Sequence, residues 1–174
     1  MTTNIQYPIG QFIEPETIGS ALINTAIDEI DSFPARLLKE VELLEDFQLD
    51  TPYRPGGWTI RQVVHHCADS HMNSLIRFKL ALTEDKPVIK PYFEDRWANL
   101  PDSKLEIQSS ILLLNAIHIK WVILLKTLTE ADLQRSYIHP DNEKEYSLAL
   151  ALILYAWHCK HHLAHITTLK FDKG

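Results

Sequence analysis

The sequence predicts an all-α protein built as a single four-helix bundle. Apolar residues recur at helical spacing over four long segments, strict apolar–polar alternation is scarce, and serine or threonine cap signals precede three of the segments. The chain has 174 residues, of which 45% are hydrophobic and 23% charged. This composition excludes a disordered or fibrous protein, and the length suits one domain, 1–174, with its own core.

The first half of the chain contains two predicted helices. A helical region spans about 16–44, and Pro34 inside it predicts a kink or a split into two helices. The second helix begins after Thr59, which forms a predicted capping box with Gln62, and continues to about Leu82. Between these helices, the prolines and glycines of 51–57 predict a stiff turn.

The third helix follows a proline-bearing loop at 86–102, which is long enough for a lid or a partner-contact segment. Ser103 and Glu106 predict a second capping box at the start of this helix, which continues through 111–125. The length of the loop permits a crossover connection in place of simple up-down order.

The last helix is expected from an N-cap at Ser147 to about Lys170, after a short polar connection at 137–142. The longest apolar run of the chain, 148–157, is too short to span a bilayer. Residues 1–10 carry no basic cluster and no apolar segment typical of a signal peptide. We therefore expect a cytoplasmic protein without a membrane partner.

The charge and the residue usage narrow the function classes further. A formal net charge of −6 and a pI near 5.8 disfavour a nucleic-acid partner, which requires clustered Lys and Arg. Only 5 glycines argue against a glycine-rich nucleotide-binding fold. The two cysteines, Cys67 and Cys159, lie in predicted helices and fit a reducing compartment rather than a disulfide framework.

Histidine is the unusual residue, with 9 in the chain and four of them within 157–165. His158 and His162 are four residues apart, so both lie on one helix face and can bind one metal ion, although the glutamate of an HExxH motif is absent. His161 and His165 form a competing pair with the same spacing. The centre of the apolar face lies between His158 and His162, which favours this pair as the inward one, while His165 remains close.

A metal ion needs at least one further ligand, and the second helix offers three candidates. His71 lies on the apolar face and is most simply a core histidine bonded to a carbonyl. His66 lies on a polar face with Gln62 and Arg77, which is either solvated or lines a polar cleft. The pattern also leaves His65 open as a ligand.

Other reactive residues receive simpler interpretations. His118 and His139 have no partner at ligand spacing, so we assign them no metal role. Cys67 and Cys159 are interpreted as small buried hydrophobic residues rather than thiolate ligands. Asp69 is either an acceptor that orients a ligand imidazole or a plain surface carboxylate.

Three segments of the chain resemble the DinB superfamily, and more closely its YfiT-type branch. They are 7–10, 52–73 and 157–166, and they occur in the family's order along nearly the whole chain. The resemblance implies a bundle of up-down-down-up type with one divalent metal ion, zinc or nickel, on three histidines. In this family the first ligand lies eight positions after the helix-opening tryptophan, and the others form an H-x-x-x-H pair on the last helix.

Transferred to this sequence, the resemblance implies His66, which follows Trp58 by eight positions, as the first ligand, and His158 and His162 as the other two. It also implies that the polar face of His66 lines the site rather than bulk water.

Three positions depart from the family pattern. Gln62 stands where glutamate is common, His165 where glutamine is common, and Cys67 where leucine is common. These departures leave the three ligands in place.

The resemblance implies a metal-dependent hydrolase that acts on a small molecule through its metal ion and the bound water. One alternative is a thiol S-transferase that activates a low-molecular-weight thiol of the bacillithiol type, and another is a non-catalytic metal-binding bundle. Cys159 stands where an HExxH motif has its general-base glutamate, which disfavours a peptidase-like mechanism. A homodimer is expected from the resemblance and from the apolar richness of the helices.

Overall fold

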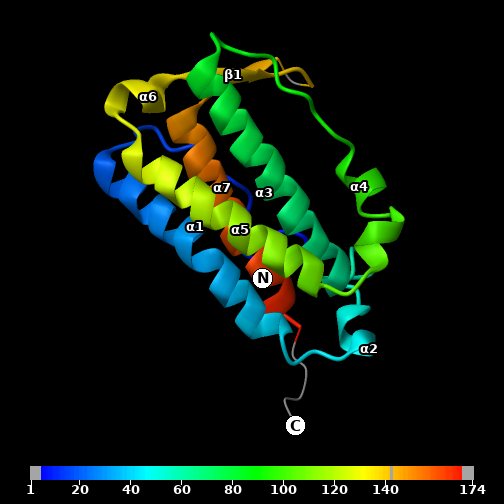
Figure 1. Ribbon diagram of the computed structural model, residues 1–174. Coiled ribbons are helices and arrows are strands. Elements are labelled where there is room, and N and C mark those ends of the chain that lie inside the picture. Colours follow the sequence, from blue (N-terminus) through cyan, green and yellow to red (C-terminus); the bar gives the residue numbers. More distant parts are fainter. Residues whose placement is uncertain (1–4, 142, 170–174) are drawn as a thin grey trace.

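The computed structural model describes residues 5–141 and 143–169. Four long helices, α1, α3, α5 and α7, form a bundle, and short elements occupy the connections (Figure 1). In chain order the elements are α1 (Ser20–Val41), α2 (Asp46–Leu49), α3 (Ile60–Thr83), α4 (Glu94–Trp97), the 3₁₀ helix η1 (Pro101–Lys104), α5 (Gln108–Thr127), α6 (Glu130–Gln134), β1 (Ser136–His139), β2 (Lys144–Ser147) and α7 (Leu148–Thr167).

The bundle has the up-down-down-up order. α3 and α5 run in the same direction, and α1 and α7 run in the opposite one (Figure 1). α1 and α3 each pack against both α5 and α7. Because α3 and α5 are parallel, the segment 84–107 returns along the outside of the bundle, and it carries α4 and η1. The predicted four-helix bundle and crossover are confirmed.

The core consists of the facing sides of the four long helices. Phe33, Phe78 and Trp121 are fully buried there, and the rings of Phe78 and Trp121 meet edge to face with centroids 5.4 Å apart. Burial of such aromatic side chains removes large apolar areas from water, and edge-to-face pairs add to this stabilisation.

α1 is one continuous helix over Ser20–Val41, so the predicted split at Pro34 and the predicted span of 16–44 are wrong, whereas the alternative of a kink at Pro34 stays a prediction. Proline has no N–H, so the carbonyl of Ile30, four residues earlier, loses its helical partner. That carbonyl instead accepts a hydrogen bond from Nδ1 of His118 on α5, at 2.6 Å. A bond from a neighbouring helix thus replaces the one that proline removes.

Two predicted helix caps are confirmed. At the start of α3, the Gln62 amide donates to Thr59 Oγ1 at 3.1 Å, and the Thr59 amide donates to Gln62 Oε1 at 3.0 Å. At the start of α7, the Leu150 amide donates to Ser147 Oγ at 3.1 Å. α7 is described to Thr167, whereas the predicted end at 170 lies outside the described residues.

The capping box predicted at Ser103 and Glu106 is wrong. Ser103 lies inside η1, and its hydroxyl donates to the main-chain oxygen of Trp97 at 3.1 Å. α5 begins later, after Ile107, without a side-chain cap. The hydroxyl that a cap would need is therefore already engaged in a contact within the crossover.

The connection predicted as polar at 137–142 contains instead part of an antiparallel hairpin of β1 and β2. Tyr137 and Tyr146 face each other across it, with stacked rings 5.7 Å apart. Such cross-strand aromatic pairs stabilise short strands. The short helices α2 and α6 were not predicted from the sequence either.

α5 is long and apolar enough to cross a membrane by length and composition alone. A core helix of a bundle meets the same criteria, and α5 packs against α1 and α3, so this feature is weak support for a membrane span.

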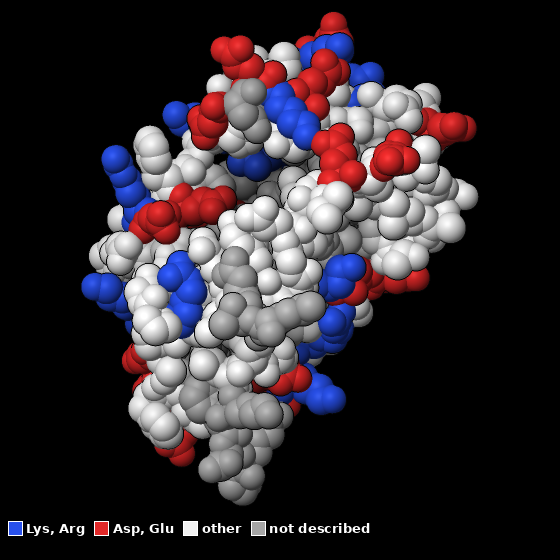
Figure 2. All heavy atoms as spheres, turned by 180° about the vertical axis from the view of Figure 1, so that it is seen from behind, with Lys and Arg blue, Asp and Glu red and all other residues white. Residues whose placement is uncertain are grey.

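The outer side of α5 exposes Leu112, Ile119 and Ile123. On the face shown in Figure 2, basic and acidic side chains are interspersed around the rim.

Candidate metal centre

The first two turns of α3 are held by polar contacts with other segments. Nη2 of Arg61 donates to Asp46 at 2.6 Å, and its Nε donates to Asp50 at 2.7 Å, which fixes α2 against α3. Nη1 of Arg61 and Nε2 of His65 both donate to the main-chain oxygen of Leu105, at 3.2 and 3.1 Å. These contacts hold the start of α3 rigidly beside the end of the crossover.

The polar face of α3 is an interior face. Nε2 of Gln62 donates to the main-chain oxygen of Ala98 at 2.8 Å, which brings the crossover over this face. His66 and Ser70 are each only 4% exposed. The ring of Trp58 packs against the ring of His66, with centroids 4.6 Å apart. Of the two interpretations that the sequence pattern left open, the solvated face is therefore excluded at His66.

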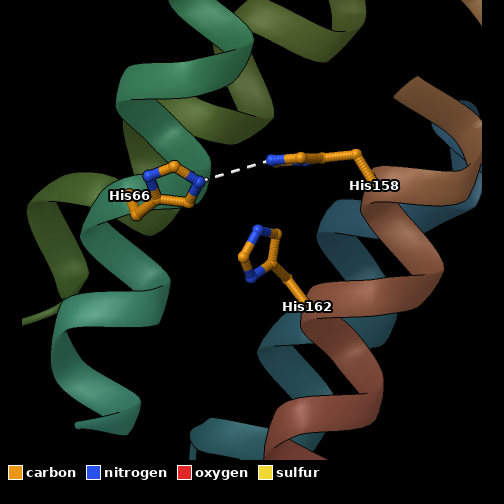
Figure 3. A group of neighbouring side chains, drawn as sticks. All are labelled: His66, His158 and His162. Atoms are coloured by element: carbon orange, nitrogen blue, oxygen red, sulfur yellow. Dashed lines mark hydrogen bonds between the residues drawn. The ribbon is translucent and has the colours of Figure 1, made fainter. Parts of the chain in front are cut away.

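His66, His158 and His162 converge between α3 and α7. Figure 3 shows the three rings turned toward one space, one from α3 and two from successive turns of α7. One ring nitrogen of each lies within 4.8 Å of the others. The Nε2 atoms of His66 and His158 are 3.3 Å apart. Two imidazoles on a tetrahedral zinc ion, with Zn–N bonds of about 2.0–2.1 Å, would have nitrogens about 3.3–3.4 Å apart.

The electrostatics of the three histidines favour metal binding. Burial lowers the pKa of His66 to about 3, and the nearby His161 and His165 contribute to this shift. Burial and the neighbouring histidines also lower the pKa values of His158 and His162 well below their ordinary value. All three imidazoles are therefore neutral at pH 7, and neutral imidazole is the form that binds a metal ion.

A second group, His161, His162 and His165, also has ring nitrogens within 4.8 Å of one another. All three lie within little more than one turn of α7, and adjacent helical residues such as His161 and His162 point about 100° apart. The ring of His165 is stacked on Tyr53, with centroids 3.9 Å apart. Ligands from two helices can surround an ion more completely, so the group with His66 fits better.

His71 is buried in the core, as expected, but its predicted bond to a carbonyl is wrong. Its Nδ1 lies 2.7 Å from Nε2 of His118, and its Nε2 lies 3.1 Å from Nδ1 of His158. His71 and His118 are thus linked to the candidate ligand His158. The sequence assigned His118 no metal role because no other histidine lies at ligand spacing from it. Its hydrogen-bond partners come from distant parts of the chain.

His65 and His139 do not join the group around His66. His65 is bonded through Nδ1 to Ser110 Oγ at 2.7 Å, and through Nε2 to Leu105. His139 lies in β1.

Asp69 and the two cysteines lie near the candidate ligands in sequence but have other surroundings. Among the hydrogen bonds of residues 5–141 and 143–169, none joins the Asp69 carboxylate to His65 or His66. Burial, together with Asp102, raises the pKa of Asp69 to about 6. Cys67 and Cys159 are free and fully buried, and burial raises the pKa of both thiols, as expected of small core residues.

A four-helix bundle with three converging, neutral histidines defines a class of helical proteins with a candidate metal centre. The family model of the DinB superfamily matches residues 29–166. The chain belongs to this superfamily.

Relatives and a solved structure agree with this placement. A protein of Bacillus cereus and one of Bacillus anthracis are each 54% identical over 167 residues, which is 96% of both chains. Both carry the name "Putative metal-dependent hydrolase". The solved structure of YfiT from Bacillus subtilis is 50% identical, covers 95% of each chain and has a TM-score of 0.92. It is described as a probable metal-dependent hydrolase with an unusual four-helix bundle topology.

Proposed function

We propose that this protein is a metal-dependent hydrolase in which His66, His158 and His162 hold one divalent ion, zinc or nickel. The observation that carries the proposal is the convergence of three neutral imidazoles from two helices, those of His66 and His162 buried and that of His158 partly buried, with two Nε2 atoms 3.3 Å apart. The names of the relatives and of the YfiT structure support the same class of reaction.

The donor set fits such an ion. Three neutral ligands leave its full charge of +2, and imidazole accepts both zinc and nickel. A divalent ion bound in this way supplies Lewis acidity and lowers the pKa of a coordinated water or thiol. A small-molecule substrate is the partner that this chemistry implies.

The residues around the three histidines position their rings. Trp58 covers one side of the His66 ring, and the four-residue spacing on α7 places the rings of His158 and His162 4.3 Å apart. The hydroxyl of Ser70 lies 3.4 Å from Nε2 of His158 and 3.5 Å from the hydroxyl of Tyr155. Ser70 therefore offers a neutral hydrogen-bonding group next to the site.

A thiol S-transferase is the second candidate, and one observation favours it. Among the residues with described positions, the group of possible ligands around His66 consists of three histidines and includes no carboxylate. A thiol bound to the ion as thiolate needs no further base, whereas hydrolysis gains from one.

Metal content tests the ligand assignment. We expect His66→Ala, His158→Ala and His162→Ala each to lose most of the bound zinc or nickel in elemental analysis of the purified protein. His139→Ala is the control, because His139 lies in the hairpin, and it should retain the wild-type content. Wild-type content in His66→Ala would overturn the assignment.

Activity assays separate the two reactions. The metal-loaded protein is given a panel of esters and amides, and separately a low-molecular-weight thiol with the electrophile monochlorobimane. Cleavage that is lost in His66→Ala supports the hydrolase, and adduct formation that is lost in this variant supports the transferase. Bound metal with neither activity would favour the third candidate, a non-catalytic metal-binding bundle.

The remaining expectations stay predictions. They are a cytoplasmic location, a homodimer, and the absence of nucleic-acid and membrane partners. The net charge of −6 supports the exclusion of nucleic acid. Sedimentation velocity of the metal-loaded protein would test the homodimer directly.

A further inference from the structure

A line of hydrogen bonds links α1 to the candidate ligand His158 through two other histidines. Nδ1 of His118 lies 2.6 Å from the main-chain oxygen of Ile30, and Nε2 of His118 lies 2.7 Å from Nδ1 of His71. Nε2 of His71 lies 3.1 Å from Nδ1 of His158. The line therefore crosses all four long helices, from α1 through α5 and α3 to α7.

The direction of these bonds is determined by the carbonyl at one end. A carbonyl oxygen only accepts, so His118 must carry its proton on Nδ1, and its neutral ring then accepts at Nε2. His71 must in turn donate from Nδ1 and accept at Nε2. His158 must donate from Nδ1, which leaves the lone pair on its Nε2.

The rings are neutral because they are buried. His71 is 0% exposed and His118 is 2% exposed. A charged imidazole in such a position would have a large desolvation cost. Each ring therefore carries one proton, and the alternation of donor and acceptor nitrogens holds along the whole line.

The carbonyl of Ile30, at the start of the line, has no partner within α1, and the sequence explains why. Pro34 lacks the N–H that would bond to Ile30 within α1. The Ile30 oxygen is therefore available to His118, although it lies inside a continuous helix. Pro34 has no reactive group, but it thus determines which nitrogen donates in each hydrogen bond of the line.

We infer that His71 and His118 are positioning residues that fix the proton of His158 on Nδ1 and present its Nε2 lone pair to the metal ion. The inference rests on the proposed role of His158 as a ligand. Hydrogen bonds to the second nitrogen of a ligand histidine fix its tautomer and ring orientation, and their loss typically lowers metal affinity about 10–100-fold.

Nitrogen-15 NMR of the histidine rings tests the tautomers without any metal. In the metal-free wild type at pH 7 we expect His118, His71 and His158 to be protonated on Nδ1. Two other histidines serve as internal controls, because His65 and His165 donate from Nε2 to the carbonyls of Leu105 and Gln6. They should show the opposite tautomer. A proton on Nε2 of His71 or His118 would overturn the inference.

Three variants test the effect on zinc binding, measured by competition with a chromophoric chelator. His118→Leu removes the acceptor for His71, the direct partner of His158, and should lower zinc affinity about 10-fold, the lower end of the range for a direct partner. His118→Gln places an amide oxygen the same number of bonds from the backbone as Nε2, so it should retain most of the affinity. Phe33→Leu is the packing control, since Phe33 contacts the rings of both His71 and His118.

The outcomes separate a positioning role from a structural one. Rescue by glutamine, with affinity close to wild type in Phe33→Leu, supports the inference. Equal losses in His118→Leu and Phe33→Leu, or wild-type affinity in His118→Leu, would contradict it. If the wild type binds no zinc or nickel, the proposed function fails, whereas the ring spectra still decide the tautomers. If His118→Leu does not fold, the glutamine variant and these spectra provide the test.

Discussion

Arg61 allows a quantitative test of how the start of α3 is held beside the candidate site. The perturbation is Arg61→Met, which keeps most of the apolar stem and removes the guanidinium. The guanidinium makes three hydrogen bonds, to Asp46, Asp50 and the main-chain oxygen of Leu105. Its side chain is 8% exposed, whereas the carboxylate partners are 73% and 59% exposed.

The expected cost follows from these exposures. Ion pairs with solvent-exposed carboxylates typically contribute about 0.2–1 kcal/mol each. The bond to Leu105 has a charged donor and a neutral acceptor, and such bonds contribute about 1.5–3 kcal/mol. We take its lower end, because His65 still donates to the same oxygen after the substitution. The free energy of unfolding should therefore fall by about 2–3.5 kcal/mol.

Urea denaturation of the metal-free protein measures this change, and thermal unfolding provides a second reading. For a chain of this length, about 1 kcal/mol corresponds to a Tm change of about 2–4 °C. Lys126→Met is the control, since Lys126 pairs with Asp31 at the surface and both side chains are about half exposed. It should cost less than about 1 kcal/mol. Equal costs for the two substitutions would refute the view that Arg61 clamps α2 and the crossover to α3.

Two further predictions concern titratable groups whose pKa values are raised. The pKa of Asp69 is raised to about 6, so its effect on stability is most favourable below pH 4 and is lost as the pH rises through 6. Asp69→Asn should therefore raise the free energy of unfolding at pH 7 by about 1 kcal/mol, after allowance for solvent screening. The same substitution should cause no such increase at pH 4. Urea denaturation at the two pH values checks the sign of the effect. Cys67 and Cys159 are fully buried, and burial raises the pKa values of their thiols. A thiol reagent should therefore label them only after the protein unfolds. Rapid labelling of the native protein would contradict this prediction, because it would show that these positions open to solvent.

Local signals in the sequence predicted the features that depend on neighbouring residues. The capping box of Thr59 and Gln62 involves residues three apart, and the structure contains it. The motif at Ser103 and Glu106 has the same spacing, but it failed because a contact with Trp97 engages the serine hydroxyl. A local motif therefore predicts a helix start only where no tertiary contact competes for its polar atoms.

The candidate site was predictable in part. Periodicity favoured His158 and His162 over their neighbours, and the structure brings both close to His66. Periodicity could not show that the polar face of His66 is an interior one, because the cover comes from the crossover. It provided no sign of His118 at all, since the partners of this residue are 47 and 88 positions away.

His66 and His158 are 92 positions apart along the chain, so the proposed ion would also affect the stability of the fold. An ion shared by α3 and α7 would close a ring of chain that includes the crossover, α5 and the hairpin. Closing a flexible ring of this length costs about 4 kcal/mol of chain entropy, which the folded protein has already lost. The ion would therefore act as a removable cross-link, and a chelator should lower the free energy of unfolding, as reduction does in a disulfide-linked protein.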